Sequence, residues 1–369
     1  MKRFFLFIRK LWVVTVMCLC VTGLSAQNVG KYLKDCEIYN EGHKYGILFR
    51  GQPMISPTYD EIVPLTDYVF RVKERNTYGL LSVGFTNERD YRGKPSHVIA
   101  EEKIKGSKYY IFFFLSEPCI YDRIELIGDG YMMVYKGEKR GVVNKYGSRV
   151  IPSKYDEITR KENVFYVRSG DRQGVYSRYG DVIVPCRYTE IDWNGNAYCV
   201  RDGNKYGVIS KYGDRIVPTK YDKITRKENV FYVTLGDLQG VYNRYGEVIV
   251  PSRCSKISWD GNVYWVQQGD RSGIINKYGE VIVPVQYDKV TKIKDTYCVE
   301  KGNLYGVYNR YGNRLLSCTY DSIDFLRDGK FLAVKGGKKQ LYSRYGTLIS
   351  DYSDKAVYYS TSDKNSKVK

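Results

Sequence analysis

The sequence predicts an all-β protein, built from about nine tandem β-meanders of 33 residues that form an open, elongated array or superhelix. Three observations lead to this fold class. A Tyr-Gly pair recurs at a near-constant spacing, short apolar runs alternate with glycine-containing turns, and no segment keeps a helical periodicity long enough for a helix. A closed β-propeller is the alternative, although about nine blades exceed the usual range.

The repeat is marked by the tyrosines of the Tyr-Gly pairs, which recur at one constant step and then a slightly longer last step. A glycine shortly before the tyrosine marks six of these units, and Gly46 and Gly79 open two more upstream. The last unit has Gln340 in place of this glycine, as expected for a degenerate terminal repeat. The seven tyrosines are Tyr146, Tyr179, Tyr212, Tyr245, Tyr278, Tyr311 and Tyr345.

Each unit is predicted to contain about three short strands. In residues 207–239, "GVIS" and "RIV" flank the turn "KYGD", and Pro218 should end the second strand because proline cannot donate to a central ladder. "TKYDKI" then reads as a compact connector before the strand "VFYVTL". One such unit cannot bury its own apolar face, so stacked neighbours must supply the core.

A longer period of two units overlies the first. "TRKENVFYV" occurs at residues 159–167 and again at 225–233, and Trp193 and Trp259 are separated by the same interval. Duplication of a two-unit block is the favoured interpretation. The alternative is that odd and even units have different neighbours.

The chain is divided into a signal peptide at residues 1–26, a repeat domain at 27–349 and a polar, flexible tail at 350–369. "MKRFFLFIRK" and the apolar run after it have the charge and length of an export signal, with a retained N-terminal anchor as the alternative. We expect no membrane span after cleavage, and a periplasmic, outer-membrane-associated or extracellular location. The second repeat carries an irregular insert at about residues 80–119.

The chemistry of enzymes is poorly represented. The only histidines are His43 and His97, and no CxxC motif or histidine cluster indicates a metal site. The cysteines after the signal follow the repeat and are predicted to be small buried hydrophobic residues, with a Cys186–Cys199 disulfide left open. We therefore predict no enzyme activity and no catalytic, cofactor-binding or metal-binding residues.

A carboxylate follows a tyrosine in most units, where a glycosidase would need one unequal pair of acids. Such repetition favours a structural role, in which aspartate accepts a hydrogen bond from a backbone N–H in a turn. A repeated calcium site is the alternative. The residues are Asp60, Asp122, Asp156, Asp222, Asp288 and Asp321.

A lysine or arginine precedes each turn tyrosine, and stacking should align these pairs along one edge. Such an edge could hold a polyanion or an acidic glycan by charge and ring stacking. The alternative is that charged turns only keep strand edges soluble. The candidate residues are Lys145, Tyr146, Arg178, Tyr179, Lys211, Tyr212, Arg244, Tyr245, Lys277, Tyr278, Arg310, Tyr311, Arg344 and Tyr345.

The repeat resembles the WG-repeat family, a bacterial β-repeat named for a Trp-Gly pair. The resemblance covers about residues 41–349 and implies a β-repeat fold without assigned catalytic residues. The family tryptophan is replaced here by Tyr, Gln, Arg, Ser or Lys. The residues that carry the resemblance are Gly207, Lys211, Gly213, Val217, Pro218, Tyr221, Asp222 and Ile224, with their copies.

Together these features predict an exported, non-catalytic binding or scaffold protein of the bacterial envelope. With a net charge of +18, the partner is expected to be an anionic polysaccharide or another envelope polymer or surface glycan. Export disfavours a nucleic acid. The alternative is a protein–protein scaffold whose specificity lies in the irregular second repeat.

Overall fold

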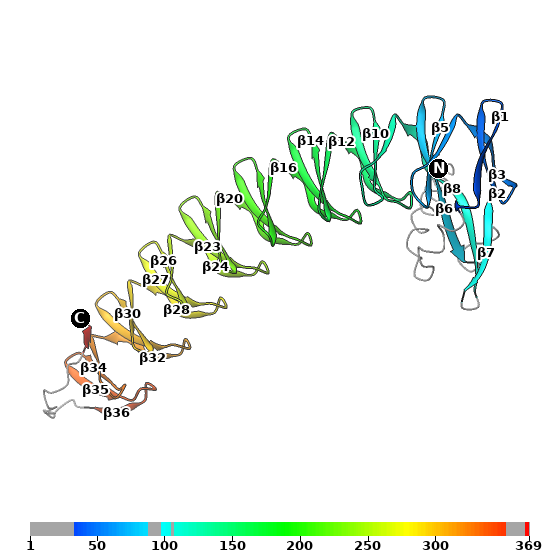
Figure 1. Ribbon diagram of the computed structural model, residues 1–369. Coiled ribbons are helices and arrows are strands. Elements are labelled where there is room, and N and C mark those ends of the chain that lie inside the picture. Colours follow the sequence, from blue (N-terminus) through cyan, green and yellow to red (C-terminus); the bar gives the residue numbers. More distant parts are fainter. Residues whose placement is uncertain (1–32, 88–96, 105–106, 352–365, 369) are drawn as a thin grey trace, which may run out of the picture. The chain divides into compact units, whose positions relative to one another are not determined.

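The computed structural model describes residues 33–87, 97–104, 107–351 and 366–368. The predicted signal peptide, residues 1–26, lies outside these described residues. The regular elements from Cys36 onward are β strands, which confirms the all-β prediction. The chain divides into two compact units, residues 1–189 and 190–369, and each unit is a succession of open antiparallel sheets (Figure 1).

Unit 1 holds four sheets. Sheet A contains β1 (Cys36–Glu41), β2 (Lys44–Phe49) and β3 (Gln52–Tyr59). Sheet B contains β4 (Glu61–Pro64), β5 (Val69–Glu74), β6 (Thr77–Asn87), β7 (Val98–Ile104) and β8 (Ser107–Tyr121). Sheet C contains β9 (Arg123–Leu126), β10 (Met132–Lys136), β11 (Lys139–Val143) and β12 (Arg149–Tyr155). Sheet D contains β13 (Glu157–Lys161), β14 (Val164–Ser169), β15 (Arg172–Ser177) and β16 (Val182–Tyr188).

Unit 2 holds five sheets. Sheet E contains β17 (Glu190–Trp193), β18 (Ala197–Asp202), β19 (Lys205–Ser210) and β20 (Arg215–Tyr221). Sheet F contains β21 (Lys223–Lys227), β22 (Val230–Leu235), β23 (Leu238–Asn243) and β24 (Val248–Cys254). Sheet G contains β25 (Lys256–Trp259), β26 (Val263–Gln268), β27 (Arg271–Asn276) and β28 (Val281–Tyr287). Sheet H contains β29 (Lys289–Ile293), β30 (Thr296–Lys301), β31 (Leu304–Asn309) and β32 (Arg314–Tyr320). Sheet I contains β33 (Ser322–Phe325), β34 (Phe331–Lys335), β35 (Lys338–Tyr342), β36 (Leu348–Asp351) and β37 (Ser366–Val368).

A regular repeat has four strands, so the prediction of about three was too low. The polar segment that the sequence presented as a connector contains a strand, β21 in sheet F, which pairs with β22 from Lys223↔Thr234 to Lys227↔Val230. Only Asp222 separates β20, the last strand of sheet E, from β21. From sheet B onward, each sheet begins one residue after the last strand of the sheet before it. In a regular four-stranded sheet the three hairpin turns are called first, second and third in chain order.

Pro218 does not end its strand, contrary to prediction, because β20 continues through a bulge. Tyr206 pairs with Tyr221 and Val208 pairs with Val217, so Gly207 alone lies opposite residues 218–220. A proline in a bulge has no ladder hydrogen bond to donate. A Cβ on Gly207 would lie 2.9 Å from the Cα atom of Thr219, which explains why this slot needs glycine. In sheet I the position of this glycine is occupied by Gln340. It pairs one-to-one with Asp351, so that there is room for a side chain.

The apolar core lies between successive sheets. In unit 2, Val208 and Val217 of sheet E pack in one cluster with Phe231 and Val233 of sheet F. A buried tyrosine pair crosses the same interface, with the two hydroxyl oxygens of Tyr221 and Tyr242 2.8 Å apart. Equivalent pairs with hydroxyl separations of 2.7–2.9 Å join sheets C and D, G and H, and H and I, namely Tyr155–Tyr176, Tyr287–Tyr308 and Tyr320–Tyr342.

The interface between sheets F and G lacks this pair. Cys254 and Ile275 occupy the two slots there, and both are buried. Hydrogen-bonded and apolar interfaces therefore alternate through sheets E to H. This alternation is a structural counterpart of the two-unit period, and both duplication of a two-unit block and different neighbours of odd and even units would produce it.

We expect the Tyr221–Tyr242 pair to show strong coupling in a double-mutant cycle. Tyr221→Phe should cost about 1–3 kcal/mol, because it leaves the buried hydroxyl of Tyr242 without its partner. Tyr242→Phe should cost less, since the Tyr221 hydroxyl keeps Ser252 Oγ at 3.1 Å. The double variant should be destabilised by less than the sum in urea denaturation of the full chain. Additive losses would contradict a coupled pair.

The insert of the second repeat is regular rather than irregular where it is described. It lengthens β6 and β8, which pair as far as Asn87↔Tyr109, and adds β7 beside β8. Leu80, Ile111 and Phe113 are buried in one core cluster with residues of sheets A, B and C. The insert is therefore an extension of sheet B.

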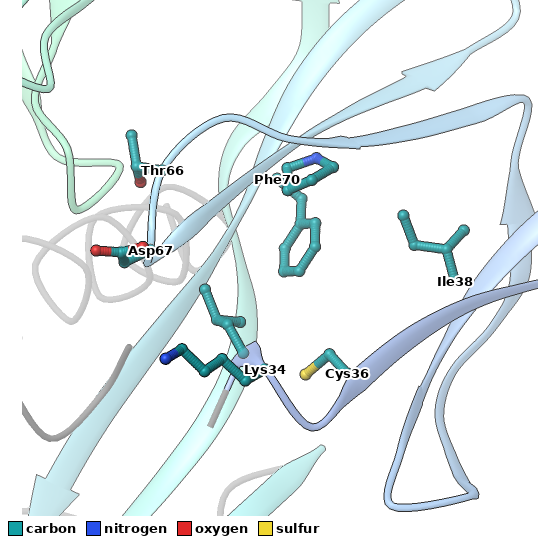
Figure 2. Close-up of a pocket in the computed structure, with 8 residues that line it drawn as sticks. Lys34, Cys36, Ile38, Thr66, Asp67 and Phe70 are labelled. Atoms are coloured by element: carbon teal, nitrogen blue, oxygen red, sulfur yellow. The ribbon is translucent and has the colours of Figure 1, made fainter. Parts of the chain in front are cut away.

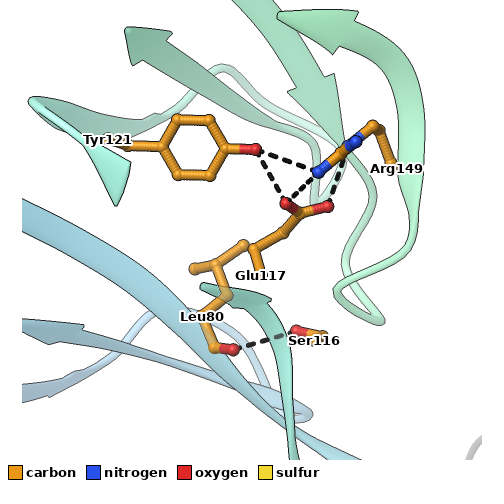
Figure 3. Close-up of polar contacts among 5 residues, drawn as sticks. All are labelled: Leu80, Ser116, Glu117, Tyr121 and Arg149. Atoms are coloured by element: carbon orange, nitrogen blue, oxygen red, sulfur yellow. Dashed lines mark hydrogen bonds and ion pairs between the residues drawn. The ribbon is translucent and has the colours of Figure 1, made fainter. Parts of the chain in front are cut away.

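An ion pair with a buried carboxylate joins sheets B and C (Figure 3). Glu117 of β8 occupies the slot that holds the buried Ile151 in sheet C, and it is 3% exposed. Arg149 of β12 donates to both carboxylate oxygens of Glu117, with an Nε–Oε1 distance of 3.0 Å, and the Tyr121 hydroxyl donates to Oε2 at 2.7 Å. Tyr121 lacks the tyrosine partner of the later sheets because Val143 stands in that slot. Glu117 and Arg149 take the place of that partner.

Part of the predicted tail is ordered against sheet I. Residues 366–368 form β37, which pairs with β33 through Ile323↔Val368 and Phe325↔Ser366. The remainder of the tail that was predicted to be flexible, residues 352–365 and 369, lies outside the described residues. Strand β37 covers the backbone edge that β33 presents.

Candidate functional site

The predicted cation–tyrosine edge is located on the third hairpin turn of sheets C to I. In the first of these turns, the Asn144 side-chain oxygen accepts hydrogen bonds from the backbone N–H groups of Tyr146 and Ser148, both at 3.0 Å. Serine does the same in other turns, as at Ser210. The glycine after each tyrosine has positive φ where a tight turn requires it, for example 83° at Gly147.

The turn tyrosines are exposed rather than packed on the neighbouring unit. Six of them, from Tyr179 to Tyr345, keep 70–77% of their surface. Tyr146 is the exception at 38%, because its ring lies 5.0 Å from that of Tyr68. Exposed aromatic rings in fixed turns can contact a ligand without a large rearrangement.

The preceding cation lies over each of these rings. The distances from the charged group to the ring centroid are 4.6–5.2 Å for all seven pairs. In three pairs the guanidinium also donates to the phenol, as from Arg344 Nη2 to Tyr345 Oη at 2.7 Å. Each turn therefore presents a cation and a ring as one preformed element.

Within each unit these elements are in register from sheet to sheet. In unit 2, a Cβ on Gly246 would lie 3.1 Å from the Ile216 carbonyl oxygen, which follows the third turn of the preceding sheet. Gly279 and Gly346 approach Ile249 and Leu315 in the same way. We call the pairs that are aligned within a unit the Tyr-Gly row of that unit. The row has Lys145–Tyr146 and Arg178–Tyr179 in unit 1, and Lys211–Tyr212, Arg244–Tyr245, Lys277–Tyr278, Arg310–Tyr311 and Arg344–Tyr345 in unit 2.

Sequence reasoning missed an acid in four of the seven turns, although the letters show it. Asp181, Asp214, Glu247 and Glu280 follow the Tyr-Gly pair directly. Each is held by the first residue of its turn, as by the Asn243 Nδ2 to Glu247 Oε2 bond at 2.6 Å. The other three turns have Ser148, Asn313 or Thr347 instead. The row is therefore less basic than its cations alone indicate.

The repeated aspartates have the predicted structural role, but over a longer distance in sequence. Asp222 Oδ2 accepts a hydrogen bond from the Gly236 N–H at 2.7 Å, in the second turn of sheet F. Its other oxygen pairs with Lys205 Nζ at 2.5 Å. The Lys205 ammonium, followed by the Gly236 amide, lowers the pKa of Asp222. Equivalent bonds of 2.5–2.7 Å involve Asp60, Asp122, Asp156, Asp288 and Asp321.

The structure also locates the histidines and two of the cysteines that the sequence raised as candidates. His43 and His97 are both exposed, and no group of three or more potential metal ligands occurs among the described residues. Cys186 and Cys199 are both free thiols, so the disulfide left open by the sequence is not formed. Burial raises the pKa of the Cys298 thiol to about 12, which disfavours a reactive thiolate.

Unit 1 has a hollow of about 370 Å³ beside β1 and the first turn of sheet B (Figure 2). Its walls are largely apolar, with Ile38, Pro64 and Phe70 among them, and Lys34 and Asp67 are its charged residues. These residues do not form an acid–base or nucleophile arrangement. Separately, the described residues include no helix with the length and apolar character of a membrane span.

Comparison with known families identifies the repeat. The model of the WG-containing repeat matches residues 174–206, 273–305 and 305–338. The chain contains WG repeats. At the position of the tryptophan that names these repeats, Tyr206 stands directly opposite Tyr221 of the Tyr-Asp pair. This slot thus lies on the paired strands beside the bulge, away from the Tyr-Gly row.

Other comparisons add little. None of the curated proteins compared with the chain matches it. Among solved structures, Hsv2p of Kluyveromyces lactis is 12% identical over 67% of this chain and 92% of its own, with a TM-score of 0.18. PorZ of Porphyromonas gingivalis (9% identity, 86% and 46% covered, TM-score 0.19) and AztD of Citrobacter koseri (8% identity, 86% and 94% covered, TM-score 0.20) are also similar. At such scores these likenesses carry no argument.

The WG repeats and the tandem sheets make the chain a β-repeat protein, an architecture that is consistent with a binding or scaffold role.

Proposed function

We propose that this chain is an exported, non-catalytic binding protein of the bacterial envelope that holds an anionic polymer or acidic surface glycan along the Tyr-Gly row. The observation that carries the proposal is the exposed tyrosine with its own cation, repeated in register within each unit. Each contact is weak, but several linked contacts to one polymer act together. The net charge of +18 adds a general attraction for anions.

The acids in the turns modulate this attraction. Lys277 and Arg244 each share a turn with a glutamate, whereas Arg344 and Lys145 do not. We expect the turns without an acid to contribute most to polyanion binding, and the turns with an acid to contribute mainly through their rings.

The test measures binding of the purified chain to acidic and neutral polysaccharides across a salt series. Affinity for acidic polymers should fall steeply with salt because counterions are released. Successive Lys→Gln and Arg→Gln changes along the row should reduce the salt dependence step by step. Equal binding to neutral polymers, or no change in these variants, would contradict the proposal.

The matched control consists of two variants that remove a negative charge from the row instead of a positive one. Glu247→Gln and Glu280→Gln keep a side chain that accepts the bond from the asparagine of the turn, but they remove the negative charge. They should strengthen binding to acidic polymers. If they weaken it, the row does not act through its charge.

A protein partner at sheet B is the second candidate function. Leu115 and Ile120 of β8 are 48% and 37% exposed, and aliphatic side chains on a long strand can contact another protein. If the polysaccharides do not bind, loss of a partner in a Leu115→Ser and Ile120→Ser double variant would favour this function.

A further inference from the structure

A second row of residues lies beside the first hairpin turns of unit 2. At equivalent positions of successive repeats, sheets E to H present Trp193, Arg226, Trp259 and Lys292. Aromatic and cationic side chains therefore alternate, and we call these four residues the tip row. The first and third turns of a four-stranded meander lie at the same end of its sheet, and Arg310 of a third turn lies 3.8 Å from Asp295 of a first turn in sheet H. The tip row is thus at the same end of the sheets as the Tyr-Gly row.

Both tryptophans are exposed and yet fixed. Trp193 and Trp259 keep 45% and 40% of their surface. Each pairs across the hairpin with a buried tyrosine, Tyr198 or Tyr264, at ring-centroid distances of 4.7 and 4.5 Å. A large exposed ring that is already oriented loses little conformational entropy on binding.

We call each tryptophan together with the hairpin turn that follows it a tip, named after its tryptophan. In both tips, a cation from the following sheet contacts the polar residue next to the tryptophan. Arg226 Nη1 donates to Asn194 Oδ1 at 3.3 Å, next to Trp193 in the chain. Lys292 Nζ lies 3.4 Å from Asp260 Oδ2, next to Trp259. The same constellation of indole, short polar side chain and cation is therefore built twice, two sheets apart.

The two copies differ in charge. Partial burial opposes ionisation of Asp260, but hydrogen bonds from the Val263 and Asn262 amides and the Trp265 indole lower its pKa to about 2. Asp260 is therefore ionised and balances Lys292. Asn194 is neutral, so Arg226 remains uncompensated by its neighbour at the Trp193 tip.

We propose that the tip row is a saccharide-binding site, with the Trp193 tip taking a sugar that bears a carboxylate and the Trp259 tip taking a neutral sugar. The polarised C–H groups of a pyranose ring fit against the electron-rich face of an indole. The Asn194 amide nitrogen, whose hydrogen bond to Cys199 Sγ is long at 3.6 Å, can donate to a sugar hydroxyl. Arg226 can form a charge-assisted hydrogen bond with a carboxylate. This inference rests on the proposed glycan binding and extends it to a second row and a class of sugar.

Single-stranded nucleic acid fits the tip row less well. Binding of that kind stacks successive bases on successive aromatic side chains. Here the indoles occur on every second sheet, and about 10 Å separates stacked sheets, so several bases would have no platform.

The test uses oligogalacturonate and its methyl ester, in which the carboxyl group is charged in the acid and neutral in the ester. By calorimetry on the full chain, Trp193→Ala should weaken oligogalacturonate binding about tenfold, the scale of one lost stacking contact. Arg226→Gln should weaken binding of the acid but not of the ester. Trp259→Ala should weaken both forms alike.

Asp260→Asn is the matched variant, because Asn194 shows that an amide caps the same turn, accepting from the Ala197 N–H at 3.0 Å. The substitution removes the negative charge that pairs with Lys292. Affinity for oligogalacturonate should therefore rise several-fold, while affinity for the ester stays the same. An unchanged or lower affinity would overturn the charge assignment of the two tips.

The outcomes separate this inference from the proposed function. If Trp193→Ala leaves binding intact while Tyr-Gly row variants reduce it, the tip row is not a site and the function stands. If the tip variants abolish saccharide binding while row variants do not, the tip row stands and the Tyr-Gly row is the part that fails. Tighter binding of a DNA oligonucleotide that Trp193→Ala abolishes would overturn the saccharide class.

Discussion

Replacing Arg149 with alanine is expected to destabilise unit 1 by about 3 kcal/mol, the lower end of the cost of breaking a buried pair. Glu117 is 3% exposed and would keep only the Tyr121 hydroxyl as a partner. The lower end applies because half of the Arg149 side chain already contacts solvent. The loss of stability is measured as a lower midpoint in urea denaturation of the full chain, with a probe that reports on unfolding of unit 1.

The control variant changes the other member of the ion pair, Glu117. Glu117→Val restores the aliphatic side chain that Val184 and Val217 provide in the same slot, both fully buried. We expect a change near zero, because well-packed apolar residues replace buried ion pairs at little cost. The prediction would be contradicted if Arg149→Ala left the denaturation midpoint unchanged. It would also be contradicted if Glu117→Val lowered the midpoint as much as Arg149→Ala, because the loss would then not come from an unpaired buried carboxylate.

Gly207→Ala is expected to destabilise unit 2 by about 2–3 kcal/mol, the cost of overpacking a rigid site. The new Cβ would lie 2.9 and 3.0 Å from the Cα and N atoms of Thr219, and backbone atoms in a bulge cannot move aside like the end of a side chain. The strands must separate or the bulge must change, and chemical denaturation of the full chain would show a lower midpoint.

Gln340→Ala supplies the comparison for this prediction. Gln340 occupies the same slot in sheet I, where the strands pair without the bulge at this position. The substitution should change the free energy of unfolding by less than about 0.5 kcal/mol, the usual range for such sites. Equal effects at both positions would show that glycine acts through backbone entropy and not through close contact.

The period and the turns could be predicted from sequence because they depend on local chemistry. Asn276, Tyr278 and Gly279 specify their turn within a few residues, so the repeat and the all-β class followed. The fourth strand was missed because "KITRK" of β21 has no clear alternation, and only its pairing with β22 makes it a strand. Pro218 was misread because a bulge depends on the partner strand.

The candidate site was predicted in part. The cation and ring positions follow from the repeat, and their exposure required the structure, since Tyr212 and Tyr221 look alike in sequence but are 77% and 1% exposed. The pairing of Trp193 with Arg226 of the next sheet could not be seen, because it depends on how two sheets stack. In the sequence, the spacing of Trp193 and Trp259 by two repeats was the one signal that pointed to this arrangement.

The alternating tyrosine interfaces constrain how such a chain can grow or shrink in evolution. Loss of residues 222–254 would place Tyr221 opposite Ile275 and leave a buried hydroxyl without its tyrosine partner. Loss of residues 222–287 would instead place Tyr221 opposite Tyr308 and rebuild the contact. Gains and losses of repeats in pairs should therefore be inherited more readily than single ones, and the repeat region would change its length two sheets at a time.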